Sequence, residues 1–516
     1  MIILRRVSQV CFLAIFLFLF VKARFPYSGN LPSDLFLRFS PLSPLFYLIA
    51  DLRIPPFLWP GLLVLFFTIF FGRFFCGWIC PLGTTLDIFR RFLGSGNKSE
   101  QNFGGREKYF KYMILLAAIT FAMFSMNFWA VLDPLSIFNR TLTIVIFPFF
   151  SAVFSLTKDL VRKTPIVSEI FGGLLQLVQK NFFPEGRGFF LEVFSIGGLF
   201  ILVLWLEKMS SRFWCRNICP AGAVLGIFSR FKVYNRNVNS ACKMCGICTS
   251  GCKMGSIPEK TPQETLKTEC IQCMSCGKMC PMGESAVSFK FGSELSPVPT
   301  EIPRRYFLKT FLGSMLGAGM GKISLDNPES RWRLIRPPGA LPEPEFLQKC
   351  IRCMECVRIC QSNGGCLQPD QNISRLSSLW SPIAVMRTGY CEFNCNLCGK
   401  ICPTRSIVEL SIEVKRKKQM GIAYFDKNLC IPYTRNENCL VCEEHCPTPK
   451  KAIKFELREV SLEGTLKKVM YPFVDRNLCI GCGICETKCP IPGKSGIIVV
   501  NEKPREPRLP SQSGRS

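Results

Sequence analysis

Cysteine spacing constrains this chain more than any other feature. Of its 30 cysteines, 24 fall into six blocks of four. Four blocks have the spacing Cys-x2-Cys-x2-Cys-x3-Cys that is typical of bacterial ferredoxins, and the blocks that open at Cys391 and Cys430 have longer first gaps. The pattern indicates [4Fe-4S] clusters, and it therefore predicts a protein that carries electrons.

In ferredoxins of this type, the first three cysteines of a block hold one cluster and the fourth reaches the neighbouring cluster, so blocks act in pairs. The rule predicts six ligand sets, which we name after their first cysteine. They are the Cys242 set (Cys242, Cys245, Cys248, Cys280), the Cys270 set (Cys270, Cys273, Cys276, Cys252), the Cys350 set (Cys350, Cys353, Cys356, Cys402), the Cys391 set (Cys391, Cys395, Cys398, Cys360), the Cys430 set (Cys430, Cys439, Cys442, Cys489) and the Cys479 set (Cys479, Cys482, Cys485, Cys446). About six [4Fe-4S] clusters are therefore expected.

Other uses of these residues fit less well. Zinc ribbons use two cysteine pairs per site and often histidine, whereas this chain has triplets of cysteine and a single histidine, His445. Cysteines two residues apart in triplets do not all pair sensibly as disulfides. One histidine does not supply the two axial ligands of a membrane b haem, and the glycine-rich run 317–322 lacks the spacing of a nucleotide loop. We expect neither haem nor flavin.

The net charge of +27 raises the question of a nucleic-acid partner. The basic residues are scattered through loops beside apolar runs and among the cysteine blocks, and no DNA or RNA motif is recognisable. A membrane surface and anionic clusters are the better partners for this charge, so no nucleic acid is expected.

Apolar runs in the first 210 positions predict a polytopic α-helical membrane domain. Runs near 7–21, 56–72, 110–132 and 189–206 approach or reach the roughly 20 residues that cross a bilayer. A shorter run at 141–156 contains proline, and we interpret it as a re-entrant or interfacial segment, with a fifth crossing as the alternative. Basic residues before the first run, after the second and after the last place the N-terminus in the cytoplasm.

A repeat lies within this membrane part. Residues 73–92 and 212–231 agree at twelve of twenty positions, and each segment follows a predicted span and contains Cys-x3-Cys-Pro-x-Gly. The repeated cysteines, called here the membrane cysteines, are Cys76, Cys80, Cys215 and Cys219. They are predicted to converge as four thiolates on one additional redox centre or as a redox-active thiol group. The alternative is a small buried residue in a helix-breaking turn.

Three acidic residues and two further cysteines stand outside these patterns. Asp51, Asp87 and Asp133 lie near predicted span ends, where they are interfacial anchors or caps, or candidate contacts for the quinol that the family resemblance given next implies. Cys11 is expected to pack within the first span, and Cys366 to lie near a cluster without being a ligand.

These elements resemble known families. The repeated membrane elements, residues 133–140 between them and the first ferredoxin pair resemble the NapH and NosR type of membrane iron-sulfur protein over roughly residues 1–290. Residues 300–495 resemble the NapG and MauM type of exported ferredoxin. The resemblance implies a fusion that takes electrons from the quinone pool, as a quinol dehydrogenase component or electron carrier, and delivers them to a periplasmic reductase or cytochrome. The alternative is an accessory or assembly factor that reduces a metal or cofactor while another enzyme matures.

The join between the two halves resembles a twin-arginine export signal. Arg304 and Arg305 precede a Gly-rich apolar segment, with Pro303 where serine or threonine is usual. Such a signal exports folded, cofactor-loaded domains, which predicts that residues after about 325 lie on the periplasmic side of a bacterial inner membrane. The alternative is a basic linker that leaves the C-terminal half in the cytoplasm.

The predicted fold class is multidomain: a polytopic α-helical membrane domain plus three α+β bacterial-type 2[4Fe-4S] ferredoxin modules. Weakly alternating segments at 422–425, 452–455 and 497–500 are predicted strands of the modules. The expected boundaries are 1–235 for the membrane domain, 236–292, 345–415 and 416–502 for the modules, 293–344 for the linker and 503–516 for a disordered tail.

Overall fold

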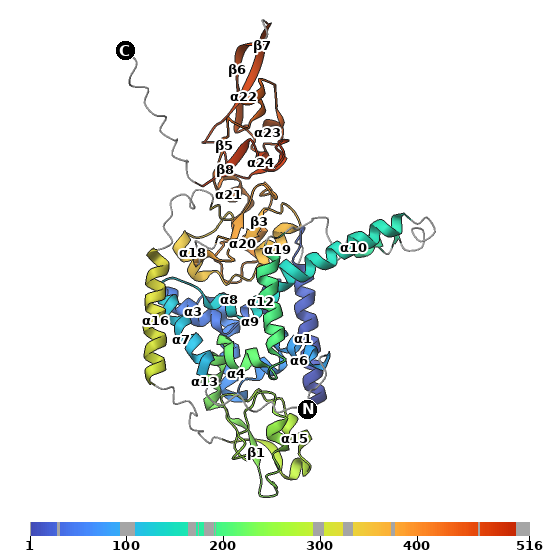
Figure 1. Ribbon diagram of the computed structural model, residues 1–516, viewed down its shortest axis with the longest axis vertical. Helices are drawn as coiled ribbons and strands as arrows, with labels where there is room; N and C mark the ends of the chain where they lie inside the picture. Colours follow the sequence, from blue (N-terminus) through green and yellow to red (C-terminus); the bar gives the residue numbers. More distant parts are fainter. Residues whose placement is uncertain are drawn as a thin grey trace.

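The chain is arranged in three layers along its long axis. The computed structural model describes residues 2–27, 31–92, 109–163, 172–173, 175–179, 190, 192–292, 304–323, 334–372, 377–462 and 465–501. Figure 1 shows the cysteine-rich region 234–291 beside the N-terminus of the chain, a layer of helices in the middle, and the remaining cysteine-rich region beyond the opposite end of this layer. The predicted tail 503–516 and parts of the predicted linker lie outside the described residues.

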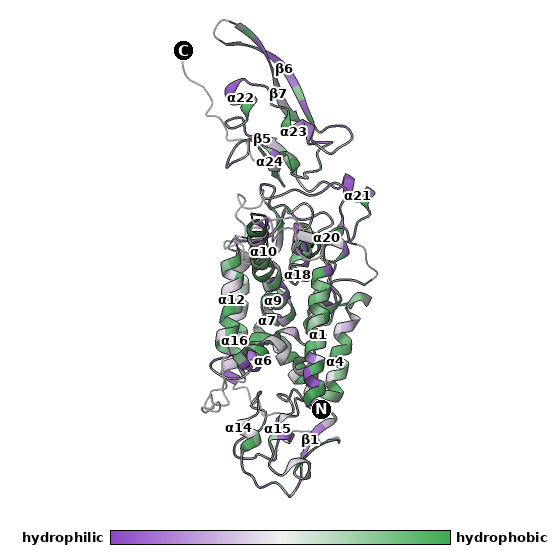
Figure 2. Cartoon of the chain, turned by 90° about the vertical axis from the view of Figure 1, so that its right-hand side faces the viewer, coloured by the Kyte–Doolittle hydropathy of each residue, from purple (hydrophilic) through white to green (hydrophobic). Residues whose placement is uncertain are grey.

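The middle layer is built from helices of the first 231 residues together with one later helix. Its longer elements are α1 (Ile2–Lys22), α3 (Leu42–Asp51), α4 (Trp59–Phe71), α6 (Pro81–Phe92), α7 (Phe110–Met123), α9 (Pro134–Thr141), α10 (Phe147–Arg162), α12 (Val193–Leu206), α13 (Pro220–Phe228) and α16 (Arg304–Ile323). Its short elements are α2 (Leu35–Arg38), η1 (Pro56–Leu58), α5 (Phe74–Trp78), α8 (Trp129–Leu132), η3 (Leu142–Ile146), η4 (Trp214–Ile218) and η5 (Ser229–Phe231). Figure 2 shows that apolar residues dominate this layer.

The predicted spans are only partly reproduced. By length and composition, two helices of the described residues are able to cross a membrane: α1 and the continuous helix Pro134–Arg162. The runs near 56–72, 110–132 and 189–206 form apolar helices of fewer than 18 residues, so the structure does not confirm a crossing at these three runs. Local backbone explains why the 110–132 run ends early, because Ser125, just after α7, has φ of 65°, whereas the helix in the 56–72 run ends at Phe71, as predicted.

The run at 141–156 is not an isolated short segment. It lies inside the helix Pro134–Arg162, which continues through Pro148. Proline removes a backbone donor and clashes with the carbonyl four residues earlier, and the π-helical turn Leu142–Ile146 covers that position. The second half, α10, projects sideways from the layer close to the C-terminal cysteine-rich region (Figure 1), and none of its residues is buried.

The cysteine-rich regions contain small antiparallel sheets. The strand pairs are β1 (Tyr234–Val238) with β2 (Val287–Phe291), β3 (Leu367–Pro369) with β4 (Pro382–Ala384), β5 (Ile422–Phe425) with β8 (Ile497–Val500), and β6 (Ile453–Leu462) with β7 (Thr465–Val474). The predicted strands 422–425 and 497–500 are confirmed as β5 and β8, and 452–455 overlaps the start of the longer β6. β1 and β2 flank the segment that carries the blocks at 242–252 and 270–280. In the same way, β5 and β8 flank the segment that carries the blocks at 430–446 and 479–489.

Each cysteine block also has one short helix. These helices are α14 (Ile247–Ser250), α15 (Ser275–Met279), α19 (Glu355–Gln361), α20 (Leu397–Lys400), α23 (Val441–Glu444) and α24 (Ile484–Lys488). Every one of them contains the third cysteine of its block. Three more helices, α18 (Glu343–Lys349), α21 (Ile412–Lys417) and α22 (Ile431–Arg435), and one 3-10 turn, η6 (Gly283–Ser285), complete these regions.

Candidate iron-sulfur centres

Four cavities are each lined by four cysteines that the sequence assigned to one set. The cavities contain Cys242, Cys245, Cys248 and Cys280; Cys252, Cys270, Cys273 and Cys276; Cys360, Cys391, Cys395 and Cys398; and Cys446, Cys479, Cys482 and Cys485. In every case, three thiols come from one block and the fourth from the paired block. Among the described residues, no three Cys, His, Asp or Glu side chains are close enough to hold a single metal ion.

The other two sets also converge. Cys350 and Cys353 lie within electrostatic range of Cys402, and Cys356 lies within range of all three. Likewise, Cys442 lies within electrostatic range of the other members of its set, which are Cys430, Cys439 and Cys489. The structure therefore brings together the four thiols of each of the six predicted sets.

The loops that carry these thiols share a backbone pattern. In the four regularly spaced blocks, the second and fourth residues after the first cysteine adopt left-handed conformations. These residues are Met244 and Gly246, Gln272 and Met274, Arg352 and Met354, and Gly481 and Gly483. Alternation of right- and left-handed residues turns successive N–H groups toward one concave side, which suits an anionic group such as a thiolate-ligated cluster. The blocks that open at Cys391 and Cys430, which the structure describes throughout, lack this pattern.

The Cys391 set has an additional thiol in its cavity. Cys366 is buried, lines the same cavity, and has its Sγ 3.9 Å from Cys360 Sγ. Cys366 thus lies beside one of the predicted cluster ligand sets, as expected from the sequence. Cys11, by contrast, is exposed on α1, so the expectation that it packs inside the protein is wrong.

The C-terminal sets follow one another outward from the helical layer. The Cys391 and Cys479 sets are adjacent, because the Cys391 N–H donates to the Cys482 carbonyl at 2.8 Å. The Cys479 and Cys430 sets draw their cysteines from the same two blocks, and Cys485 lies within electrostatic range of Cys442. The order from the layer outward is therefore the Cys350, Cys391, Cys479 and Cys430 sets (Figure 1).

The helical layer holds the Cys350 loop directly. Asn139, at the end of α9, donates from Nδ2 to the Cys353 carbonyl at 2.9 Å and to Glu355 Oε2 at 2.9 Å. The neighbouring Arg140 guanidinium lies over the Trp380 ring at 4.5 Å. Residues 133–140, which carried part of the family resemblance, thus form part of the contact between the layer and the C-terminal cysteine sets.

The membrane cysteines converge at the opposite side of the layer. Every pair among Cys76, Cys80, Cys215 and Cys219 lies within electrostatic range. Three of the four are buried, and all four belong to or pack against one apolar core. The repeats therefore place their cysteines together in space, as the sequence predicted.

The three candidate quinol carboxylates are already engaged. Asp51 forms an ion pair with Lys349 at 2.7 Å, and Asp133 caps α9 by accepting from Ser136 N at 2.8 Å. Although burial opposes it, Arg212 and Lys253 hold the pKa of Asp87 well below its usual range. All three side chains have structural roles, which fits the anchor interpretation better than proton transfer with a quinol.

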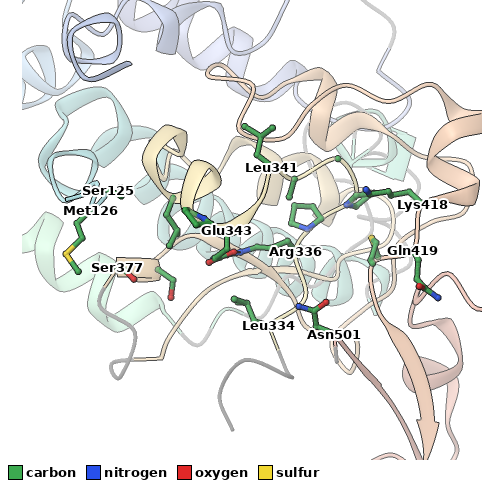
Figure 3. Close-up of a pocket in the computed structure, with 18 of the residues that line it drawn as sticks. Ser125, Met126, Leu334, Arg336, Leu341, Glu343, Ser377, Lys418, Gln419 and Asn501 are labelled. Carbon is green, nitrogen blue, oxygen red and sulfur yellow. The ribbon is translucent and has the colours of Figure 1, made fainter. Parts of the chain in front are cut away.

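A larger cavity lies where the helical layer meets the C-terminal regions. Figure 3 shows Ser125 and Met126 from the end of α7 on one side, and Lys418, Gln419 and Asn501 on the other. Arg336 crosses its wall and forms an ion pair with Glu343 at 2.6 Å. The two cavities share part of their lining, because the larger cavity and the cysteine cavity of the Cys391 set are both lined by Pro337, Pro338 and Met420. Apart from a proline-rich run at 336–344, nothing in the sequence indicates this cavity.

Comparisons with known proteins agree with this cysteine geometry. A family model described as a 4Fe-4S binding domain matches residues 54–98 and 190–238, and a second model of the same description matches residues 472–491. The first pair of matches contains the membrane cysteines, and the last match contains Cys479, Cys482, Cys485 and Cys489. No solved structure matches the chain.

Several ferredoxin-type proteins are similar to part of the chain. The methylamine utilization ferredoxin-type protein MauM of Methylophilus methylotrophus is 35% identical over 201 residues, which cover 36% of this chain and 81% of the relative. The ferredoxin-type protein NapG of Escherichia coli K12 is 31% identical and covers 36% of this chain and 80% of its own length. NapF of the same organism is 26% identical over 31% of this chain and 85% of its own length.

The cysteine sets and these matches define a ferredoxin-type iron-sulfur electron-transfer protein with 4Fe-4S binding domains. Within this class, the chain belongs to the family of the MauM ferredoxin-type proteins.

Proposed function

We propose that the chain is a membrane-anchored carrier with about six [4Fe-4S] clusters, which passes electrons from the quinol pool to a periplasmic reductase or cytochrome. In this proposal, it joins a NapH- or NosR-type membrane part to a NapG- or MauM-type ferredoxin part. The observation that carries the proposal is the presence of cysteine sets at both ends of an apolar helical layer (Figures 1 and 2).

Exposed apolar side chains support a lipid environment for the layer. α4 leaves Trp59, Phe66 and Phe67 exposed, and α12 leaves Phe194 89% exposed and Ile201 66% exposed. A soluble monomer rarely shows such extensive apolar surface, whereas a helix that is apolar all round suits a bilayer. The helix α10 has exposed apolar residues and projects sideways, which suits a helix lying at the membrane surface.

The position of α16 supports export of the C-terminal half. This helix begins with Arg304 and Arg305 and runs along the layer beside α7, with Thr310 Oγ1 3.4 Å from Met113 Sδ. It therefore leads from the end that holds the Cys242 and Cys270 sets toward the end that holds the other four sets. An inner-membrane protein with its N-terminus and first module in the cytoplasm then has its C-terminal modules in the periplasm.

The six cysteine sets are the proposed ligands of the clusters. Each provides four thiols, the number that a [4Fe-4S] cluster requires, and the bound cluster would supply one-electron redox chemistry. Nearby cations support anionic clusters: Arg236 donates from Nη2 to Cys248 Sγ at 3.4 Å, and Lys415 lies within electrostatic range of Cys391. The chain's own contribution is to hold the sets in line and exclude water between them.

Reduction by quinol tests this proposal. The purified protein in liposomes is given a reduced short-chain quinol under anaerobic conditions, and cluster reduction is followed by electron paramagnetic resonance. The wild type and the Cys11→Ser control are expected to show reduced C-terminal clusters, whereas Cys353→Ser is expected to lose this reduction beyond the Cys350 set. If dithionite reduces the clusters and quinol reduces none, the quinol assignment is wrong and an accessory role in the maturation of another enzyme becomes the better account.

A further inference from the structure

Each of the two repeats has an arginine that contacts the other repeat beside the membrane cysteines. Arg73 opens the first repeat and donates from Nη2 to the carbonyl of Cys215 at 3.0 Å. Arg212 opens the second repeat and donates from Nη1 to the carbonyl of Cys76 at 2.6 Å. Each arginine thus reaches the first cysteine of the other repeat, so the two elements form one interlocked unit.

The glycines of the two Cys-Pro-x-Gly elements make room for these contacts. A Cβ atom added to Gly222 would lie 2.6 Å from Arg73 Nη2, and one added to Gly83 would lie 3.4 Å from Arg212 Nη1. The closest atom at Gly222 is the opposite arginine, whereas the closest atom at Gly83 is the Cys76 carbonyl oxygen, at 2.9 Å, which accepts from Arg212. Both glycines therefore leave room for the arginine and carbonyl that link the two repeats, which favours a shared centre over two separate helix-breaking turns.

The surroundings of this centre carry excess positive charge. Three carboxylates pair with six cationic side chains around it: Glu269 with Arg73 and Lys111, Asp87 with Arg5, Arg212 and Lys253, and Glu207 with Arg90. Arg73, Lys111 and Arg212 are fully buried. Buried cations that exceed their counter-charges are costly, and four thiolates around an iron-sulfur cluster would supply the missing negative charge.

The centre lies between two of the cysteine sets. On one side, the Cys270 loop packs against it, because Trp78 donates from Nε1 to the Gln272 carbonyl at 3.1 Å. On the other side, α6 starts after Cys80 and packs against α9, whose Asn139 holds the Cys353 carbonyl. Cys273, the membrane cysteines and Cys353 all belong to or pack against the same apolar core.

We propose that Cys76, Cys80, Cys215 and Cys219 hold one further iron-sulfur centre, a [4Fe-4S] cluster shared by the two repeats, which relays electrons between the Cys270 and Cys350 sets. This inference rests on the proposed function for the clusters on either side. Each step moves one electron from a reduced cluster to its oxidised neighbour, and no bond forms or breaks. Each matched 4Fe-4S segment contains only two of these cysteines, so neither segment alone supplies four thiolates.

A thiol-exchange role fits these residues less well. Cys80, Cys215 and Cys219 are 5%, 6% and 3% exposed, and a partner protein's thiol has no access to side chains at this depth. Electron transfer between clusters needs no such access.

Iron content tests the inference. Full-length protein is purified anaerobically from membranes as the wild type, the double variant Cys80→Ser/Cys219→Ser and the control Cys11→Ser, whose cysteine is exposed and outside every set. The double variant is expected to lose about four iron and four sulfide per chain and one paramagnetic centre, while the control loses none. Unchanged iron in the double variant would overturn the inference.

The same data separate this inference from the proposed function. The iron that remains in the double variant counts the six ferredoxin sets, with about 24 atoms expected, and a lower number would weaken the six-cluster assignment without affecting the loss of four. If the double variant does not accumulate, the wild type decides: about 28 iron atoms per chain support the further centre, and about 24 overturn it.

Discussion

The Cys479 set and the membrane cysteines hold four thiols in different ways. The Cys479 set lies on a tight loop with left-handed Gly481 and Gly483, supported by the short helix α24 and four-residue strands. The membrane cysteines lie in or directly before helices within the largest apolar core of the described chain. The loop depends on its metal for order, whereas the helical layer has a core of its own, so the two regions should respond differently to the same disturbance.

Iron removal is expected to give the largest difference. A chelator with mild reductant should unfold residues 422–500, because little apolar core remains there without clusters, and should leave the helical layer folded. Limited proteolysis of detergent-solubilised protein, together with far-ultraviolet circular dichroism, measures both regions at once. Loss of the helical signal before cleavage within residues 422–500 would contradict the comparison.

Asp87→Asn should destabilise the end of the helical layer that contacts the first cysteine-rich region. The substitution leaves Arg212 and Lys253, both 2.9 Å from this carboxylate, without their shared counter-charge. Breaking such a buried pair costs about 3–5 kcal/mol of unfolding free energy. Denaturant unfolding monitored by tryptophan fluorescence measures the change.

The matched control for this substitution is Glu456→Gln. Glu456 forms an ion pair with Arg458 on the surface, where both side chains are 57% exposed. No measurable change is expected there, because solvent screens exposed pairs. Equal effects of the two substitutions would show that the charges around Asp87 are also solvated.

Gly481→Ala should have a smaller effect, confined to the loop. Gly481 has φ of 72°, and an added Cβ would lie 2.4 Å from the Gly421 carbonyl oxygen. Left-handed backbone costs a non-glycine residue about 1–2 kcal/mol, and the backbone contact adds to this cost. The rate of iron release from the Cys479 set measures the effect.

Gly493→Ala isolates the cost of the backbone conformation. Gly493 has nearly the same φ, 74°, but nothing lies within 4 Å of an added Cβ. The Gly493→Ala substitution should therefore accelerate iron release less than the Gly481→Ala substitution does. An equal acceleration would mean that the approach of Gly421 does not restrict the loop.

Sequence spacing predicted the cysteine geometry well because ligand sets depend on local loops and a simple pairing rule. It predicted the bounds of the apolar helices less well, since apolar runs do not reveal where a residue such as Ser125 turns the chain or how a π turn carries a helix through Pro148. Arg212 and Lys253, which both pair with Asp87, are more than 100 residues distant from it in sequence, so no local pattern identified them. Arginine at the first position of both repeats was the one available signal for the contacts between the repeats at the membrane cysteines.

The side of the membrane on which the C-terminal modules lie tests the central claim most directly. Epitope tags placed before Met1 and after Ser516 are exposed to protease in intact spheroplasts and again after lysis. The account predicts that the C-terminal tag is cleaved in intact spheroplasts while the N-terminal tag is protected until lysis. Protection of both tags until lysis would place all six cysteine sets in the cytoplasm and contradict an electron route across the membrane.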